Sequence, residues 1–100
     1  MVTLWKALAD DSRRQILLLL KKKEMTPSQI AEHFDFTFPA VSTHLRVLKD
    51  ADLVIEQKEG KNRYYSLNHK KGIEVMKFFE DVWGYKLKTL KEYVERKSRK

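Results

Sequence analysis

The spacing of apolar residues in the first third of the chain predicts three short helices. The first covers Leu4–Ala9; the second runs over about residues 10–21 and is apolar nearly all round, so we expect it at the centre of the fold. The third covers about residues 26–34, because Thr26–Gln29 (TPSQ) supplies a cap, a proline at the first helical position and a glutamine three residues after the cap. Helices this short are marginal alone and must pack on one another.

A fourth helix is predicted over Thr37–Asp52 (TFPAVSTHLRVLKDAD), with one apolar stripe and one unusual polar face. Val41, Leu45 and Leu48 recur at spacings of four and three and should face the core. The other face has short side chains and one arginine where lysine and glutamate are more usual: Pro39, Ser42, Thr43 and Arg46. Such a face can lie against base edges in a major groove. With the preceding helix and the short turn between them, it predicts a helix-turn-helix.

Residues 53–67 predict a β-hairpin. Leu53–Lys58 and Arg63–Leu67 have β-branched and aromatic residues typical of strands, and Glu59–Asn62 between them contains a glycine suited to a turn. The tip is basic, with Lys58, Lys61, Asn62 and Arg63. A helix-turn-helix followed directly by such a hairpin predicts a winged helix-turn-helix fold, mainly α with one small hairpin, in the order four helices, two strands and one helix.

From about Lys70 the pattern is helical to the end of the chain. Large apolar residues recur close to a heptad seam and make a stripe wider than a lone surface helix needs. The seam consists of Ile73, Met76, Trp83, Leu87, Leu90 and Val94, widened by Phe78, Phe79, Val82 and Tyr93. We expect a single domain overall, with a DNA-binding core over residues 1–68 and a dimerisation helix over residues 69–100. Gly84 marks a close crossing, a kink or a junction of two helices, and the sequence leaves these three open.

The net charge of +7, from 21 basic and 14 acidic residues, favours a polyanionic partner but does not locate its site. Residues 86–100 alone hold seven Lys/Arg against two Asp/Glu, so most of the excess lies in the last fifteen residues. This basic end is either a solvated helix terminus or a phosphate contact. The longest apolar run, Ile16–Leu20, is too short to span a bilayer, and no secretory signal is recognised, so we expect no membrane partner and a cytoplasmic protein.

Ordered motifs in the chain resemble the ArsR/SmtB family of bacterial winged-helix repressors. They are Leu8–Arg13 (LADDSR) leading into Ile16-Leu17, Ser42–Leu45 (STHL) followed by Leu48, Ala51–Val54 (ADLV), and Glu59–Lys61 (EGK) with Tyr64–Leu67 (YYSL). The resemblance covers about residues 4–68. It implies a homodimer, formed through the first and last helices, that binds an imperfect inverted repeat in a promoter. It also implies that residues 38, 39, 42 and 43 approach the major groove, while the wing lies over the flanking backbone or minor groove.

The chain departs from that family at two points. Phe38 stands where the family often has a polar residue, so we expect it to read a thymine methyl or to pack locally. The family's sensor ligands are also missing, since Thr26 and Ser28 stand where thiolates would, and residues 70–100 contain no histidine. We therefore expect no metal site and no cofactor, as in the metal-independent members of the family.

The sequence thus predicts a DNA-binding transcriptional regulator, a homodimeric repressor acting on double-stranded DNA. On the recognition helix the predicted contacts are Thr37, Phe38, Pro39, Ala40, Ser42, Thr43, His44 and Arg46. In the wing they are Lys58, Lys61, Asn62 and Arg63. The predicted dimer interface consists of Leu4, Trp5, Leu8, Ile73, Met76, Phe79, Trp83, Leu87, Leu90 and Val94.

No enzyme is predicted. Ser42 and Thr43 have no accompanying histidine and carboxylate, and the three scattered glycines make no phosphate-binding loop. Two alternative functions stay open. One is a winged helix that serves as a protein-interaction module; the other is a ligand-responsive regulator with a pocket beside the last helix and an unknown inducer.

Overall fold

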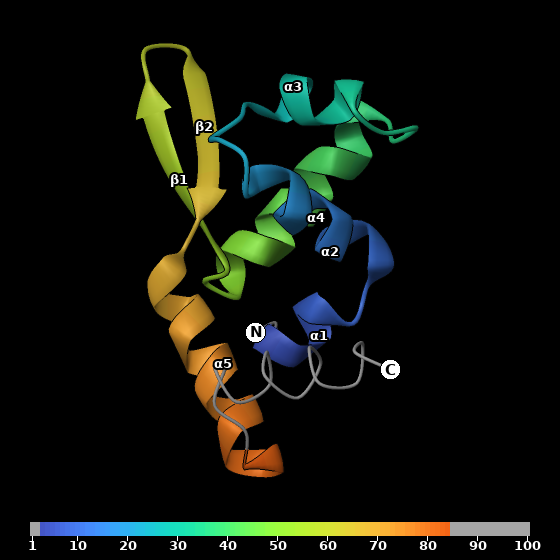
Figure 1. Cartoon of the computed structure of the whole chain (residues 1–100). Coiled ribbons are helices and arrows are strands. Elements are labelled where there is room, and N and C mark those ends of the chain that lie inside the picture. The colour runs from blue at the N-terminus through green and yellow to red at the C-terminus, as the bar shows by residue number, and fades with distance from the viewer. Residues whose placement is uncertain (1–2, 85–100) are drawn as a thin grey trace, which may run out of the picture. The chain divides into compact units, whose positions relative to one another are not determined.

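The computed structural model of the chain describes residues 3–84, which form five helices and one antiparallel hairpin (Figure 1). The helices are α1 (Leu4–Leu8), α2 (Asp11–Leu20), α3 (Pro27–Glu32), α4 (Phe38–Asp50) and α5 (His69–Trp83), and the strands are β1 (Val54–Glu59) and β2 (Asn62–Leu67). The predicted fold class and the predicted order of elements are confirmed. Two compact units can be distinguished, Met1–His69 and Lys70–Lys100.

Side-chain caps set the beginnings of the first four helices, within one residue of their predicted starts. Thr3, Asp10, Thr26 and Thr37 each accept a hydrogen bond from the backbone N–H three residues on, at 3.1–3.2 Å. At Thr26 the bond is reciprocated, because the Gln29 side chain accepts from the Thr26 backbone N–H at 2.9 Å. These bonds satisfy donors that a helix start otherwise leaves without partners. A capping residue therefore fixes where each short helix begins.

The core of the first unit is built around α4. Its stripe of Val41, Leu45 and Leu48 is almost completely buried, and α4 contacts α1, α2, α3 and β1 (Figure 1). The partners that are equally well buried include Ile16 on α2 and Ile30 on α3. Because α4 is buried along this stripe, its opposite face is left toward solvent.

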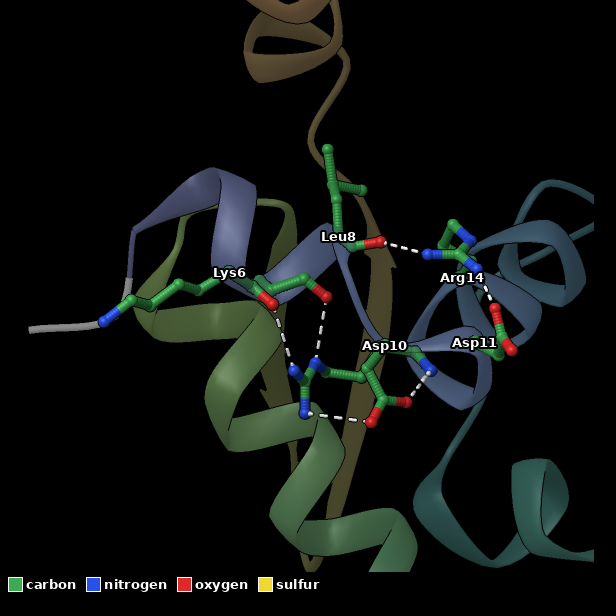
Figure 2. Close-up of polar contacts among 7 residues, drawn as sticks. Lys6, Leu8, Asp10, Asp11 and Arg14 are labelled. Atoms are coloured by element: carbon green, nitrogen blue, oxygen red, sulfur yellow. Dashed lines mark hydrogen bonds and ion pairs between the residues drawn. The ribbon is translucent and has the colours of Figure 1, made fainter.

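Two consecutive arginines on α2 donate hydrogen bonds to the last carbonyls of the five-residue helix α1 (Figure 2). The Arg13 guanidinium donates from Nε to the Ala7 carbonyl at 2.9 Å and from Nη2 to the Lys6 carbonyl at 3.1 Å, while Arg14 donates to the Leu8 carbonyl at 2.5 Å. Cations at a helix C-terminus satisfy the last carbonyls and interact favourably with the helix dipole. A helix too short to be stable alone is thus held by α2.

The chain leaves α4 through a Schellman motif. Asp52 has a positive φ of 61°, the Asp52 N–H donates to the Lys49 carbonyl and the Leu53 N–H donates to the Leu48 carbonyl, both at 2.9 Å. The motif buries Leu53 and directs the chain into β1.

The hairpin has a two-residue turn, because Glu59 pairs with Asn62 and Gly60, at the first turn position, has a φ of 61°. The middle of β2 is joined to the segment between α2 and α3. Met25 and Tyr65 exchange two backbone hydrogen bonds, at 3.0 Å and 2.8 Å, and both residues are buried. The pattern of the sequence did not indicate this pairing.

The helix α5 ends at Trp83, earlier than the predicted helix. Gly84 follows with a φ of 73°, and its N–H donates to the Glu80 carbonyl at 2.7 Å, as at a glycine that terminates a helix. A single helix continuous through Gly84 is therefore not observed. The predicted seam residues Leu87, Leu90 and Val94, with Tyr93, lie outside the described residues.

We expect Asp10→Ala to lower the free energy of unfolding by about 1 kcal/mol at neutral pH, because it removes the cap of α2. The hydrogen bond from the Arg13 N–H to the Asp10 carboxylate lowers the pKa of that group. The difference in free energy of unfolding between variant and wild type should therefore reach its full size above the ordinary pKa of aspartate. It should disappear as the pH falls through the lowered pKa of Asp10. Denaturant titration at several pH values measures it.

Asp11→Ala is the matched control, since the Asp11 side chain is exposed and does not cap the helix. Its effect should stay within a few tenths of a kcal/mol. Equal losses in the two variants would contradict the role of Asp10.

Candidate nucleic-acid interface

The outward face of α4 holds most of the residues that the sequence predicts for DNA recognition. Thr37, Phe38, Pro39, Thr43 and Arg46 are exposed, and Ala40 and Ser42 are half-buried between them. Phe38 is 51% exposed and so is not part of the core. The Thr43 hydroxyl donates to the Pro39 carbonyl at 3.0 Å, which leaves its oxygen able to accept from outside. The helix therefore presents short side chains, one aromatic ring and one guanidinium on a single surface.

His44 does not belong to that surface. It is half-buried, and its ring lies edge-on to Phe36 with the centroids 6.0 Å apart, while Phe36 stacks on Phe34. Its Nδ1 atom is buried and has no hydrogen-bond partner among residues 3–84. His44 is thus a packing residue beside the turn of the helix-turn-helix.

A groove of about 480 Å³ separates α4 from the hairpin. Phe38, Ser42 and Arg46 line it from α4 together with Lys49, and the hairpin contributes Glu56, Arg63 and Tyr65. The groove thus brings residues from the recognition helix together with one predicted wing residue, Arg63. The other predicted wing residues, Lys58, Lys61 and Asn62, are exposed at the hairpin tip and do not line the groove.

Glu56 is the centre of a polar cluster in this groove. Its carboxylate accepts a hydrogen bond from the Tyr65 hydroxyl at 2.5 Å and forms ion pairs with Lys49 Nζ at 3.3 Å and Arg63 Nη1 at 3.8 Å. The Tyr65 hydrogen bond, followed by the bond from Lys49, lowers the pKa of Glu56, and burial with the adjacent carboxylate raises the pKa of Tyr65 to about 12. At neutral pH the cluster therefore holds an ionised carboxylate and a neutral phenol.

Sequence reasoning missed Lys49, Glu56 and Tyr65. Lys49 lies three residues after Arg46, one helical turn along the same face. Glu56 and Tyr65 are direct cross-strand partners, a register that follows from the two-residue turn. These signals were present in the sequence, but only a fixed position of the hairpin relative to α4 joins them in one cluster.

Among residues 3–84, no cluster of three or more histidine, aspartate or glutamate side chains is arranged to hold a metal ion. None of the described helices combines the length and the apolar character that crossing a membrane requires.

Comparison with known proteins identifies the family. Residues 10–56 match the bacterial regulatory protein, arsR family, and the transcriptional repressor SdpR of Bacillus subtilis is 46% identical over 68 residues, which are 68% of this chain and 76% of that protein. The chain belongs to the ArsR family. The arsenical resistance operon repressor of Staphylococcus aureus is 42% identical to this ArsR-family chain over 67 residues, 67% of the chain and 64% of that repressor.

A solved structure agrees with this ArsR-family assignment. A homodimeric winged helix-turn-helix DNA-binding domain from Mycobacterium bovis, described as a possible ArsR-family regulator, is 30% identical with a TM-score of 0.65; the match covers 82% of this chain and 76% of that one. The resemblance stated from sequence and the winged helix-turn-helix fold are confirmed. As a member of this family, the chain is a DNA-binding transcriptional regulator and not an enzyme.

We expect Arg46→Ala to change the free energy of unfolding by no more than about 0.5 kcal/mol, because its side chain lies on the exposed face of α4. The adjacent Leu45 is 1% exposed, and Leu45→Ala should cost about 2–5 kcal/mol. Urea denaturation of the two variants measures the contrast. A large loss in Arg46→Ala would show that this face has a structural role.

Proposed function

We propose that this chain is a homodimeric repressor that binds an inverted-repeat operator and blocks the promoter containing it. One observation carries the proposal: the outward face of α4 is free of core contacts and lies beside a groove shared with a basic hairpin. Two relatives are named repressors, which supports repression and not activation. We assign its action to the cytoplasm, since the named relatives are bacterial and bacterial DNA lies there. We name no inducer.

Base contacts are assigned to the outward face of α4. Ser42, Thr43 and Arg46 supply hydroxyls and a guanidinium that can bond to base edges or phosphates, and Arg46 is suited to guanine. Phe38 cannot hydrogen-bond a base edge, so it reads a thymine methyl. Thr37, Pro39 and Ala40 are small enough to let the helix start approach the groove. Exposed short side chains support this assignment.

Backbone contacts are assigned to the wing. Lys58, Lys61 and Arg63 are exposed, and Asn62 lies between the last two at the turn. Such residues fix the register of the protein on the duplex without reading sequence. The sequence-specific part of the affinity is therefore assigned to α4.

The dimer interface is assigned chiefly to α5. Ile73 is 69% and Trp83 58% exposed, and Met76 and Phe79 are exposed between them. The Phe79 and Trp83 rings stack with their centroids 5.4 Å apart.

On α1, Trp5 is also exposed, while Leu4 and Leu8 are half-buried. An apolar surface of this kind is typical of an interface with a second copy. The two copies would span half-sites about 34–36 Å apart, one turn of DNA.

Selection of bound fragments from random DNA tests DNA recognition. We expect the wild-type chain to enrich an inverted repeat and Arg46→Ala to bind it about 10- to 100-fold more weakly, the size of one lost bidentate base contact. Lys22→Ala is the matched control, since it also removes one exposed positive charge but lies after α2. Gel shifts measure both. Equal affinity of the wild type for scrambled DNA would favour an interaction module and contradict the proposal.

Sedimentation tests the dimer. We expect wild-type protein at twice the mass of one chain, and the double variant Phe79→Ser/Trp83→Ser should raise the dimer dissociation constant at least about a hundredfold because two large apolar side chains per copy are lost. The control is Lys77→Ser/Asp81→Ser, at polar positions of the same helix. A wild type that sediments as a monomer at every concentration would refute this part.

A further inference from the structure

The polar cluster around Glu56 joins the two elements to which DNA contacts are assigned. Lys49 is in the last turn of α4, Glu56 is on β1, and Arg63 and Tyr65 are on β2. One carboxylate forms ion pairs with Lys49 and Arg63, at 3.3 Å and 3.8 Å, and accepts the Tyr65 hydrogen bond at 2.5 Å. The Glu56 carboxylate is therefore a polar side-chain link between α4 and the hairpin. The inference that follows rests on the proposed function.

This link differs from an ordinary surface ion pair. Exposed pairs contribute little, because water screens the charges and the side chains lose freedom when they pair. The Glu56 side chain is only 14% exposed, whereas Lys49 and Arg63 are 51% and 56% exposed. Tyr65, which donates to it, is itself buried, and its backbone is paired with Met25. The anion is thus held from beneath by a fixed phenol, while the two cations above it reach solvent.

The position of the cluster gives the charge of Glu56 a second effect. Lys49, Arg63 and Glu56 all line the groove beside α4, so a phosphate that approaches the two cations also approaches the carboxylate. A carboxylate at 3–4 Å partly neutralises each cation and restricts where its nitrogen atoms lie. The carboxylate therefore weakens binding that depends on charge alone. A duplex that fits the fixed geometry loses less affinity.

We propose that Glu56 is a positioning residue that makes DNA binding selective. It holds Lys49 and Arg63 in one geometry relative to α4, and it lowers their contribution to sequence-independent phosphate binding. Glu56 itself contacts no base in this scheme. Its removal should strengthen binding to arbitrary DNA and reduce discrimination between sequences.

The test compares Glu56→Gln with wild type on two duplexes: one selected from a random library by the wild-type chain, and a scrambled duplex of the same composition. We expect affinity for the scrambled duplex to rise severalfold, with a slope of log K against log salt steeper by up to about 2, because two cations become free for phosphates. The ratio of the two affinities should fall about tenfold, as for the loss of one charged hydrogen-bonded contact.

Glu59→Gln is the matched control. Glu59 is at the end of the same strand, is exposed, and its substitution changes the net charge equally. It should raise affinity for both duplexes and leave their ratio unchanged. If Glu56→Gln also raises both affinities equally, its effect is one of net charge and the inference is wrong.

Tyr65→Phe provides a second test, since it removes only the hydroxyl and keeps the Glu56 charge. We expect the affinity ratio to fall without a gain on scrambled DNA, and circular dichroism with thermal melting checks that each variant is folded. An unchanged ratio in a folded Tyr65→Phe chain would overturn the inference even where Glu56→Gln fails to fold. A wild-type chain that enriches no sequence would instead overturn the proposed function, and this inference with it.

Discussion

Burial of one stripe of α4 is the constraint on which the other features of the DNA-binding unit depend. Val41, Leu45 and Leu48 have almost no exposed surface, and helices α1, α2 and α3 pack around them with β1. A helix anchored along one side has only one orientation about its axis, so the side chains on the other side are fixed in direction as well. Exposure of Thr43 and Arg46 follows from the apolar residues beside them in the sequence, because these hold the helix in place.

Local interactions made much of this fold predictable. Each of Thr3, Asp10, Thr26 and Thr37 bonds to a backbone group only three residues away, so its role can be read from neighbouring residues. The stripe on α4 and the turn at Gly60 are equally local patterns. The described elements accordingly begin and end within about two residues of their predicted limits, except at Gly84, where the left-handed conformation ends a helix that the heptad pattern would continue.

The features that sequence reasoning missed depend on how separate elements pack against one another. Met25 and Tyr65 are forty positions apart and pair only because the hairpin folds back on the segment between α2 and α3. The Glu56 cluster likewise needs the hairpin beside α4. His44 is a third case. It lies at the edge of the apolar stripe, so its side chain could face the core or the solvent. Its ring packs edge-on against Phe36, which accounts for the inward position. Packing between elements, and not helix propensity, decides these three cases.

Tyr65 is tied at both ends, through its backbone to Met25 and through its hydroxyl to Glu56. Both ties lie in the middle of β2, and the turn from Glu59 to Asn62 lies beyond them. If α4 and the hairpin tip contact one duplex together, these ties keep the distance between them nearly constant. The nucleic acid then has to supply the bending, so local stiffness of the double helix would contribute to selection at base pairs that no side chain touches.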